Sequence, residues 1–369
     1  MAKKRYKVKE HQLYLVNPLT WRSLKSQNVI DPLYVKRSRF ITFFSSLSAP
    51  FQYLQKHIYD KKVEKIRFED KPPIFILGHW RSGTTHLHYI LSKDEQFGTL
   101  SNYQNFLFNV SLLNSTWLKR IVSSFMPEKR PQDNIRLGAD KPAEEEQPLS
   151  AMSERSGLHS WYFPKNQSYF EKYNLFEGIS KEEKLAWQRD YLRCLQYISY
   201  ANNNKRLLLK NPHNTSRVRE LLELFPNAKF ITIHRDPKEV FLSTRHLFHA
   251  VVSTQFLQHI SIREIDELIT SNYKQIIEKY NHDKTLIPSG NLFEINYRDL
   301  IDHPMHVVQN LYSGLNLDGL DLALPKIRQY LKSVEDFKRN TFSEHQHLSE
   351  LSIEKFLAEI NRDELVVNQ

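Results

Sequence analysis

A strand that runs into a Gly-x4-Gly loop and then a helix is the feature that most constrains the fold of this chain. Residues 74–85 read Ile-Phe-Ile-Leu-Gly-His-Trp-Arg-Ser-Gly-Thr-Thr, so an apolar run ends at Gly78 and a helical pattern begins after Gly83. Such a loop presents backbone N–H groups and a helix N-terminus to an anion, as phosphate-binding loops do. Thr84 stands where a nucleoside triphosphatase places its lysine, and Arg81 is the fixed cation. We therefore expect a phosphate ligand that suits this rearrangement.

The composition fits one large globular core with a helical appendage. The chain has 369 residues, 40% of them hydrophobic, and a formal net charge of +10, which leaves acidic ligands, nucleic acid and anionic membranes open as partners. A single cysteine, Cys194, excludes an internal disulfide framework. The sequence shows neither a secretory signal nor a run of about 18 apolar residues, so we expect a cytoplasmic protein without a membrane anchor.

Aromatic and basic side chains alternate in residues 33–58, in a segment that includes Phe43, Phe51, Lys36 and Arg39. This composition is typical of a helix that lies on a membrane surface. It is also typical of one or two helices packed on the main domain, which is the more common arrangement. The sequence leaves both interpretations open.

Short β-rich runs alternate with longer helical patterns along the chain, which indicates a parallel sheet built from β-α-β units. We expect strands at 74–77, 206–209, 229–233 and 292–296, and amphipathic helices at 84–91, 181–201, 215–224, 237–248 and 262–280. The strands are apolar on nearly both faces, as buried parallel strands are. The predicted fold is therefore α/β and P-loop-like, with three layers and a mostly parallel sheet between helices.

Three parts are expected along the chain: an N-terminal helical extension at 1–70, the main domain at 71–345 and a C-terminal helical tail at 346–369. Within the main domain, residues 97–170 are irregular and carry several prolines among aromatic residues. Insertions of this kind are where α/β enzymes build their acceptor pockets.

A second strand end also carries groups suited to an anion. Arg235 follows the strand at 229–233, Asp236 is expected to cap the next helix and Pro237 to begin it. Ser243 lies two turns into that helix, about 10 Å along its axis, so Arg235 and Ser243 can hold one phosphate. Two separate anion sites suggest a ligand with two well-separated phosphate groups.

With these two segments, the chain resembles the sulfotransferases that use 3′-phosphoadenosine 5′-phosphosulfate (PAPS). Their 5′-phosphosulfate loop is similar to residues 77–85, and their 3′-phosphate segment to residues 225–243. The likeness is greatest to the branch with arginine in the first loop, which contains bacterial and lipid-acting enzymes and is distantly similar to tyrosylprotein sulfotransferases. Residues 140–146, 209–213 and 295–304 also fit that branch. Arg298 is a departure, because many members have glutamate there.

The resemblance implies PAPS as sulfuryl donor, adenosine 3′,5′-bisphosphate as product and no required metal. The residues that it implies for the nucleotide are Arg81, Ser82, Gly83, Thr84, Thr85, Arg235, Ser243, Tyr297, Arg339 and Asn340. Sulfuryl transfer resembles phosphoryl transfer, in which positioning and charge stabilisation dominate. Arg81 and Lys210 are the cations expected to stabilise the bridging and sulfuryl oxygens.

The acceptor must lose a proton as it attacks, so a general base is expected opposite the phosphosulfate. Asp140 is expected to cap a helix whose first turn holds Glu144, Glu145 and Glu146. The resemblance favours Glu144 and Glu146 as the base. His213 directly follows a strand and is expected to assist or to replace them. The sequence leaves open which of these four residues acts.

The leading hypothesis is transfer of a sulfuryl group to a hydroxyl, or less readily an amine, of a small or lipid-like acceptor. A nucleotide kinase or triphosphatase is one alternative, and Thr84 in place of the lysine argues against it. A non-enzymatic protein that binds nucleotides or nucleic acid is another. It predicts basic residues clustered with stacking aromatics, whereas the prominent arginines here stand singly at strand ends, so no nucleic acid partner is expected. The acceptor and the oligomeric state stay open.

Overall fold

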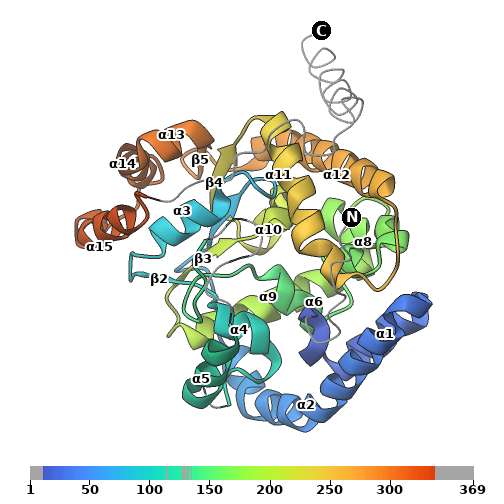
Figure 1. Ribbon diagram of the computed structural model, residues 1–369. Helices are drawn as coiled ribbons and strands as arrows, with labels where there is room; N and C mark the ends of the chain where they lie inside the picture. The colour runs from blue at the N-terminus through green and yellow to red at the C-terminus, as the bar shows by residue number, and fades with distance from the viewer. Residues whose placement is uncertain (1–10, 114, 127–129, 131–132, 134, 337–369) are drawn as a thin grey trace.

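Within the residues that the structure describes, five parallel strands form the middle layer of the molecule (Figure 1). The computed structural model describes residues 11–113, 115–126, 130, 133 and 135–336. The strands lie in the order β2-β3-β1-β4-β5. Their bounds are Ile74–Leu77 (β1), Phe97–Gly98 (β2), Arg206–Lys210 (β3), Lys229–His234 (β4) and Leu292–Asn296 (β5). Ile74 pairs with Leu208 on one side and Lys229 on the other, which puts the carboxyl ends of β1, β3 and β4 at one edge.

Helices cover both faces of this sheet (Figure 1). One face is covered by α9 (Lys181–Ala201) and α10 (Val218–Leu224), and the other by α3 (Thr84–Leu91), α14 (Pro304–Gly314) and α15 (Leu320–Ser333). Because successive residues of a strand point to opposite faces, Phe75 and Leu77 join the first hydrophobic cluster, while Ile74 and Ile76 join the second. The predicted three-layer α/β fold is confirmed.

A third hydrophobic cluster lies beside the sheet and connects the N-terminal helices to the helices that follow β4. It joins Trp21 and Ile41 to Phe248 and Ile269. The elements concerned are η1 (Gln12–Leu15), α1 (Pro18–Gln27), η2 (Pro32–Tyr34), α2 (Val35–Val63), α11 (Pro237–Ala250), η6 (Val252–Gln255) and α12 (Ile262–Asp283). The predicted N-terminal helical extension therefore packs on the main domain. None of the described helices combines the length and apolar character that crossing a bilayer requires.

The segment between β2 and α9 consists of short helices. They are α4 (Asn102–Leu107), η3 (Phe108–Val110), α5 (Ser115–Phe125), α6 (Glu146–Met152), α7 (His159–Tyr162), η4 (Pro164–Asn166) and α8 (Gln167–Leu175). The remaining elements are η5 (Pro212–Ser216), η7 (Lys284–Leu286) and α13 (Tyr297–Asp302). The irregularity expected at 97–170 thus takes the form of many brief helices connected by turns.

The strands predicted at 74–77, 206–209, 229–233 and 292–296 are confirmed within one residue, as are the full bounds of α3 and α9. The N-cap at Asp236 is also confirmed, since its side chain accepts a hydrogen bond from the Glu239 amide over 3.0 Å. The sequence missed β2, which has only two residues. The domain boundaries at 70 and 345 stay predictions, and the tail at 346–369 lies outside the described residues.

The helix expected to start after Asp140 is a correction. It begins at Glu146 instead, and no side chain caps it. The chain before it is extended: Pro142 forms a bridge with Ser101, and the Ala143 amide donates to the Leu100 carbonyl over 2.8 Å. These contacts occupy backbone groups that a helical turn would need, while Asp140 pairs with Lys119 at the surface.

Candidate active site

A cavity of about 1330 Å³ opens where the loops after β1 and β4 meet the start of α13. Arg81, Thr85, Arg235, Ser243 and Tyr297 all line it. This is the position at which open α/β sheets bind ligands, outside the carboxyl ends of their strands. The two anion sites expected from the sequence therefore share one cavity.

Three residues of the loop after β1 have positive φ angles, a conformation that glycine adopts easily and other residues rarely. Gly78 has φ 138° and Gly83 has φ 95°, and Arg81 adopts φ 72° although it carries a side chain. A Cβ on Gly83 would come within 2.6 Å of the Tyr297 ring. Gly83 is thus required both by its left-handed conformation and by the tyrosine packed against it. The arginine conformation is one that the surrounding structure must hold in place.

Arg81 joins three segments of the chain through its guanidinium. Its Nε donates to Ser243 Oγ over 2.9 Å, and its Nη1 donates to Asp133 Oδ2 over 2.7 Å. Arg130 also donates to Asp133 Oδ2, over 2.7 Å. Burial lowers the pKa of Arg81, an effect that the Asp133 carboxylate opposes. The Asp133 carboxylate thus occupies Nη1 of Arg81, a hydrogen-bond donor that an anionic ligand could otherwise use.

Arg235 lies beside the same loop and is held on three sides. Its Nη1 donates to the Arg81 carbonyl over 2.7 Å, and its Nε donates to Glu239 over 2.8 Å. Its guanidinium carbon is 4.2 Å from the centre of the Tyr297 ring, a cation–π distance. The charge of Arg235 is therefore fixed next to Arg81 at the cavity wall.

Lys210 reaches the first turn of α3 from the end of β3. Its Nζ donates to Thr85 Oγ1 over 3.3 Å and pairs closely with Glu144. The lysine side chain is almost fully buried, whereas Glu144 is partly exposed. Burial lowers the pKa of Lys210, and the Glu144 carboxylate opposes that shift. Glu144 and Lys210 form a pair connected to the loop through Thr85.

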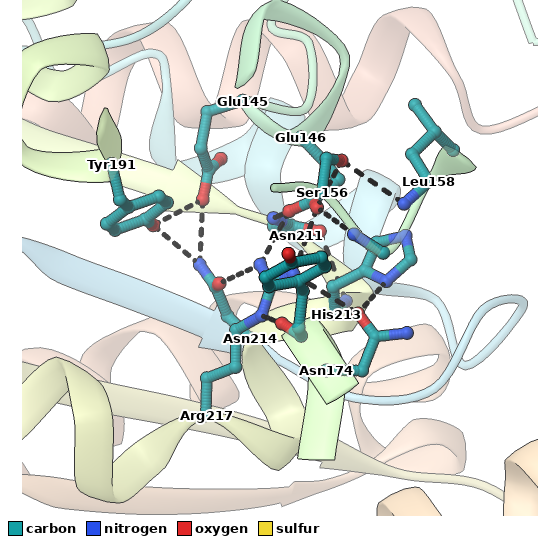
Figure 2. A network of polar contacts seen from close by, with 12 residues as sticks. Glu145, Glu146, Ser156, Leu158, Asn174, Tyr191, Asn211, His213, Asn214 and Arg217 are labelled. Atoms are coloured by element: carbon teal, nitrogen blue, oxygen red, sulfur yellow. Dashed lines mark hydrogen bonds and ion pairs between the residues drawn. The ribbon is translucent and has the colours of Figure 1, made fainter. Parts of the chain in front are cut away.

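Glu146 occupies a different environment, although it lies only two residues further along. Its carboxylate accepts two hydrogen bonds from Arg217, of 2.5 and 2.9 Å, and one from Asn211 of 2.8 Å (Figure 2). Burial alone would favour the neutral form, but the Arg217 guanidinium holds the pKa of Glu146 below its usual range. A buried carboxylate so engaged is a poor proton acceptor at neutral pH. The structure places it in a buried ion pair and not at the large cavity.

Glu145 is also fully buried, on the other side of α6. Its Oε1 accepts hydrogen bonds from the Tyr191 hydroxyl over 2.9 Å and from Asn214 over 2.7 Å (Figure 2). Burial raises its pKa to about 7. The three consecutive glutamates thus enter three different environments, and only Glu144 retains exposure to solvent.

The contacts of His213 define which of its ring nitrogens carries a proton. Its Nδ1 is 2.8 Å from Asn174 Oδ1, which also lies 3.1 Å from Nη2 of Arg217 (Figure 2). An arginine only donates, so the atom of Asn174 between them must be the oxygen. That oxygen then accepts a hydrogen bond from His213 Nδ1–H, which leaves Nε2 as the unprotonated nitrogen. Burial lowers the pKa of His213 to about 4, so the ring is neutral at physiological pH.

The His213 ring lines a small cavity of about 10 Å³ together with His79, Trp80, Trp161 and Thr244. His213 Nε2, His79 Nε2 and Trp80 Nε1 are buried and have no hydrogen-bond partner among the described residues. The volume accommodates about one water molecule or one hydroxyl group. Buried polar atoms normally find partners, so three orphaned atoms at one cavity indicate a place for a small polar group.

The two cavities lie back to back. Trp80 and Thr244 line the small cavity, whereas their neighbours Arg81 and Ser243 line the large one. Thr244 Oγ1 donates to the Trp80 carbonyl over 3.5 Å, and Arg81 bonds to Ser243. Two adjacent pairs of residues thus form the wall between the cavities.

The structure brings together most residues that the sequence singled out for the nucleotide. Those that line the large cavity are Arg81, Gly83, Thr84, Thr85, Arg235, Ser243 and Tyr297. Ser82 is buried beside it, and its amide donates to the His79 carbonyl over 3.2 Å. Lys210 contacts the cavity wall through Thr85, while His213 lies at the small cavity. Arg339 and Asn340 lie outside the described residues.

Sequence reasoning missed Asp133, Asn174, Arg217, His79 and Trp80. The last two lie inside the Gly-x4-Gly loop, so their position was a signal that they face a ligand. Asp133 and Asn174 lie in or just after the irregular segment 97–170, where no periodic pattern predicts which way a side chain points. Arg217 follows the 209–213 stretch by four residues, and only its partner Glu146, distant in sequence, gives it a role.

Comparison with known proteins supports one family. The model of the sulfotransferase family matches residues 72–321. Omega-hydroxy-beta-dihydromenaquinone-9 sulfotransferase Stf3 of Mycobacterium bovis is 33% identical over 301 residues, which cover 82% of this chain and 77% of that protein. The same values hold for the protein of that name from Mycobacterium tuberculosis.

Two solved structures share the fold. The sulfotransferase STF9 from Mycobacterium avium gives a TM-score of 0.68 at 17% identity and covers 92% of this chain and 90% of its own. Sulfotransferase STF1 from Mycobacterium tuberculosis H37Rv also gives 0.68 at 17% identity, with 94% of each chain covered.

Proposed function

This chain belongs to the sulfotransferase family, and on that premise we propose that it transfers the sulfuryl group of PAPS to a hydroxyl of a lipid-like acceptor. The observation that carries the proposal is the 2.9 Å hydrogen bond from Arg81 to Ser243, which joins the two predicted anion sites across one cavity. A donor with phosphates at its 3′ and 5′ positions needs two such sites at a fixed separation.

The residues at the large cavity fit a nucleotide of this kind. Gly83 leaves space that a Cβ would take from Tyr297, and two guanidinium groups line the wall. Thr84, Thr85 and Arg81 would hold the 5′-phosphosulfate at the N-terminus of α3, where backbone amides favour anions. Arg235 and Ser243 would hold the 3′-phosphate. The donor supplies an activated sulfuryl group, and adenosine 3′,5′-bisphosphate is the product.

The reaction exchanges one S–O bond for another. The acceptor oxygen forms a bond to sulfur as the bond from sulfur to the bridging phosphate oxygen breaks, and the acceptor proton leaves to a base. Negative charge grows on the phosphate side, so Arg81 and Lys210 are placed in the role of stabilising cations. Each forms an ion pair with a carboxylate, Arg81 with Asp133 and Lys210 with Glu144.

We assign the role of proton acceptor to His213. Supporting this assignment, its Nε2 is unprotonated and unpartnered among the described residues at the small cavity. Glu146 and Arg217 orient it through Asn174. A carboxylate base remains open at Glu144, which is partly exposed, whereas the buried bonds of Glu145 and Glu146 argue against either one.

The acceptor proposed is an amphipathic alcohol. The small cavity is lined by His79, Trp80 and His213, whose unpartnered nitrogens are polar, and by the apolar side chains of Trp161, Phe248 and Leu268. A hydroxyl attached to a hydrocarbon matches that distribution. The related Stf3 is named for a hydroxylated menaquinone, which is a lipid alcohol. The present cavity of about 10 Å³ admits only the hydroxyl, so Trp161 or Phe248 must move for the rest of the acceptor. The wall of residues 80–81 and 243–244 must also open before the acceptor oxygen can reach a sulfuryl group held in the large cavity.

Nucleotide binding tests the donor. Adenosine 3′,5′-bisphosphate should raise the thermal midpoint more than adenosine 5′-monophosphate does, and more than ATP with magnesium. Stronger protection by ATP with magnesium would overturn the proposal in favour of a kinase or triphosphatase.

Transfer itself is tested with radiolabelled PAPS and a lipid extract, with an omega-hydroxylated quinone as a defined acceptor. Label should enter the organic phase, and excess EDTA in the assay should leave the rate unchanged because no metal is required. Label that enters only polar products would overturn the lipid part of the proposal, whereas binding without any transfer would overturn the catalytic part.

A further inference from the structure

Helix α2 is amphipathic in the inverted sense. The side chains that it buries against the rest of the protein are mostly polar: Arg37, Ser38, Ile41, Ser45, Ser48, Gln52, Gln55 and Val63. A surface helix normally does the opposite, with its apolar stripe toward the core. This reversal indicates that the outer side of α2 contacts an apolar partner or medium.

Several of the buried polar side chains donate hydrogen bonds to backbone carbonyls of neighbouring segments. Ser45 Oγ donates to the Val16 carbonyl over 2.8 Å, and Gln55 Nε2 donates to the Phe108 carbonyl over 3.0 Å. Gln55 Oε1 also accepts from the Leu112 amide over 2.8 Å. Arg37 Nη1 donates to the Phe256 carbonyl over 2.5 Å. Helix α2 is thus held in one rotational position by specific hydrogen bonds at both ends.

The outer face of α2 carries a continuous apolar stripe. Phe43, Leu47, Phe51, Leu54 and Ile58 are 62%, 57%, 56%, 45% and 39% exposed. They follow one another at spacings of three and four residues, which places them on one side of a helix. The stripe runs over about 23 Å of helix at 1.5 Å per residue. Isolated exposed apolar residues are ordinary, but a contiguous stripe marks an interaction surface.

Basic residues flank this stripe at both ends. The exposed ones are Lys36 and Arg39 before the stripe and Lys61 and Lys62 after it. The only acidic residue of the helix is Asp60, and it accepts a hydrogen bond from Tyr197 of α9 over 2.6 Å, on the inner side. The outer face therefore combines an apolar centre with positive ends.

We propose that the outer face of α2, defined by Phe43, Leu47, Phe51, Leu54 and Ile58 with its flanking basic residues, docks on an anionic lipid bilayer. The apolar side chains enter the region between headgroups and acyl chains, and the basic residues contact lipid phosphates. The buried polar face keeps α2 attached to the enzyme while it lies in the membrane plane. This surface includes none of the residues assigned to the reaction, and the proposal does not depend on the reaction.

Charge argues against a second copy of the chain as the occupant. A symmetric dimer through this face pairs α2 with α2, and both ends of the helix are basic. Antiparallel helices would set Lys36 and Arg39 against Lys61 and Lys62, and parallel helices would set each pair against itself. Like charges across an interface are unfavourable, whereas anionic lipids complement all of them.

Co-sedimentation with vesicles tests the proposal. The full chain should bind vesicles of phosphatidylcholine mixed with phosphatidylglycerol and bind pure phosphatidylcholine more weakly, with binding that falls as salt rises. Phe43→Gln combined with Leu47→Gln should lower binding at least about tenfold, because two large apolar groups no longer enter the bilayer. The matched control combines Leu185→Gln and Leu322→Gln, which are 55% and 85% exposed on α9 and α15, and should bind as the unaltered protein does.

A label gives a second readout that does not depend on binding strength. Cys194, the only cysteine of the chain, is buried, so a cysteine introduced by Leu47→Cys can be labelled selectively with an environment-sensitive fluorophore. Its emission should shift to shorter wavelength with anionic vesicles, and the emission of a label at Leu322→Cys should not.

Three results would overturn the proposal. One is equal vesicle binding by the α2 double variant and the control at matched thermal midpoints. Another is an unchanged emission of the label at position 47. The last is a dimer in solution that Phe43→Gln with Leu47→Gln converts to monomer without any vesicle binding, since the face would then join two copies of the chain.

Discussion

Arg81 donates a 2.9 Å hydrogen bond from Nε to Ser243 Oγ, and these residues are 162 positions apart in the chain. The bond ties the loop after β1 to the helix after β4. Each of these segments by itself resembles an ordinary strand end. Their contact at one cavity is what supports the proposed site for two phosphates over two unrelated turns.

Arg81 and Ser243 should contribute to different steps. Replacement of Arg81 by alanine should lower kcat about 100-fold or more, because a preorganised cation at the growing charge is lost, and should weaken adenosine 3′,5′-bisphosphate less. Ser243→Ala should mainly weaken nucleotide binding. Steady-state kinetics and calorimetric titration separate these effects, and equal losses of rate and affinity in Arg81→Ala would assign the arginine to binding alone.

Asp133 should weaken anion binding, since its carboxylate occupies Arg81 Nη1 at 2.7 Å. Asp133→Asn keeps the size of the side chain and removes the charge. We expect adenosine 3′,5′-bisphosphate to bind this variant roughly three- to tenfold more tightly, with the larger gain at low salt. Calorimetry at two salt concentrations measures this. Weaker binding would mean that the carboxylate is needed to position Arg81.

His213 should be required for turnover in its neutral form. Burial lowers its pKa to about 4, so the unprotonated form persists through neutral pH and is lost only as the pH falls toward 4. We expect kcat to stay level from pH 8 to about 5 and to fall below that. His213→Ala should lose about 100-fold in kcat, and His213→Asn should not restore it. If His213→Ala lost only a few-fold while Glu144→Gln was inactive, the base would be Glu144.

Substitution of Glu146 should mainly lower stability, whereas substitution of Glu144 should mainly lower kcat. Glu146→Gln leaves the buried Arg217 without its counter-charge and is expected to destabilise the protein by about 3–5 kcal/mol. Glu144→Gln should destabilise the protein less, because the carboxylate that it removes is partly exposed although its partner Lys210 is buried, and should act through Lys210 on kcat. Urea unfolding together with kinetics of both variants checks this. A stable Glu146→Gln protein without activity would return Glu146 to a catalytic role.

Five buried histidines should make the protein acid-sensitive. Burial lowers the pKa of His11 and His88 to about 3 and of His79, His159 and His213 to about 4. The unfolded chain binds these protons near pH 6.5, so it holds more protons than the folded protein between 6.5 and 4, and stability falls as the pH drops through this window.

Glu145 acts in the opposite sense over part of that range. Its pKa is raised to about 7, so the folded protein holds this proton between pH 7 and 4.5 and gains stability as the pH falls. Each histidine contributes about 1.4 kcal/mol per pH unit and Glu145 offsets about one of them. Urea unfolding at pH 7.5 and 5.5 should therefore show a loss at the lower pH that His88→Gln reduces.

The strands and long helices could be predicted from their apolar patterns. The strands are apolar on both faces or nearly so, and the long helices are apolar on one. Ile74–Leu77 has no polar residue. Helix α9 begins directly after Ser180, whose side chain caps it, and keeps its helical period throughout. The two loops at the cavity followed from topology, which places the ends of parallel strands together.

The base and its surroundings could not be predicted in the same way. Glu144, Glu145 and Glu146 are consecutive, yet Lys210, Tyr191 and Arg217 draw them in three directions. The extended pairing of Pro142 with Ser101 moved the helix start by several residues and so changed which carboxylate faces which partner. Such outcomes depend on contacts between distant segments, which one sequence does not reveal.

The shared wall of residues 80–81 and 243–244 has a consequence for acceptor choice. Any substitution there that reshapes the small cavity also displaces a group at the large cavity, where we propose that the donor binds, so these positions cannot vary for one ligand alone. Substitutions that change which alcohol is accepted should therefore occur on the other side of the small cavity, at Trp161, Phe248 and Leu268. Relatives with the same loop and different residues at these three positions should share the donor and differ in what they sulfate.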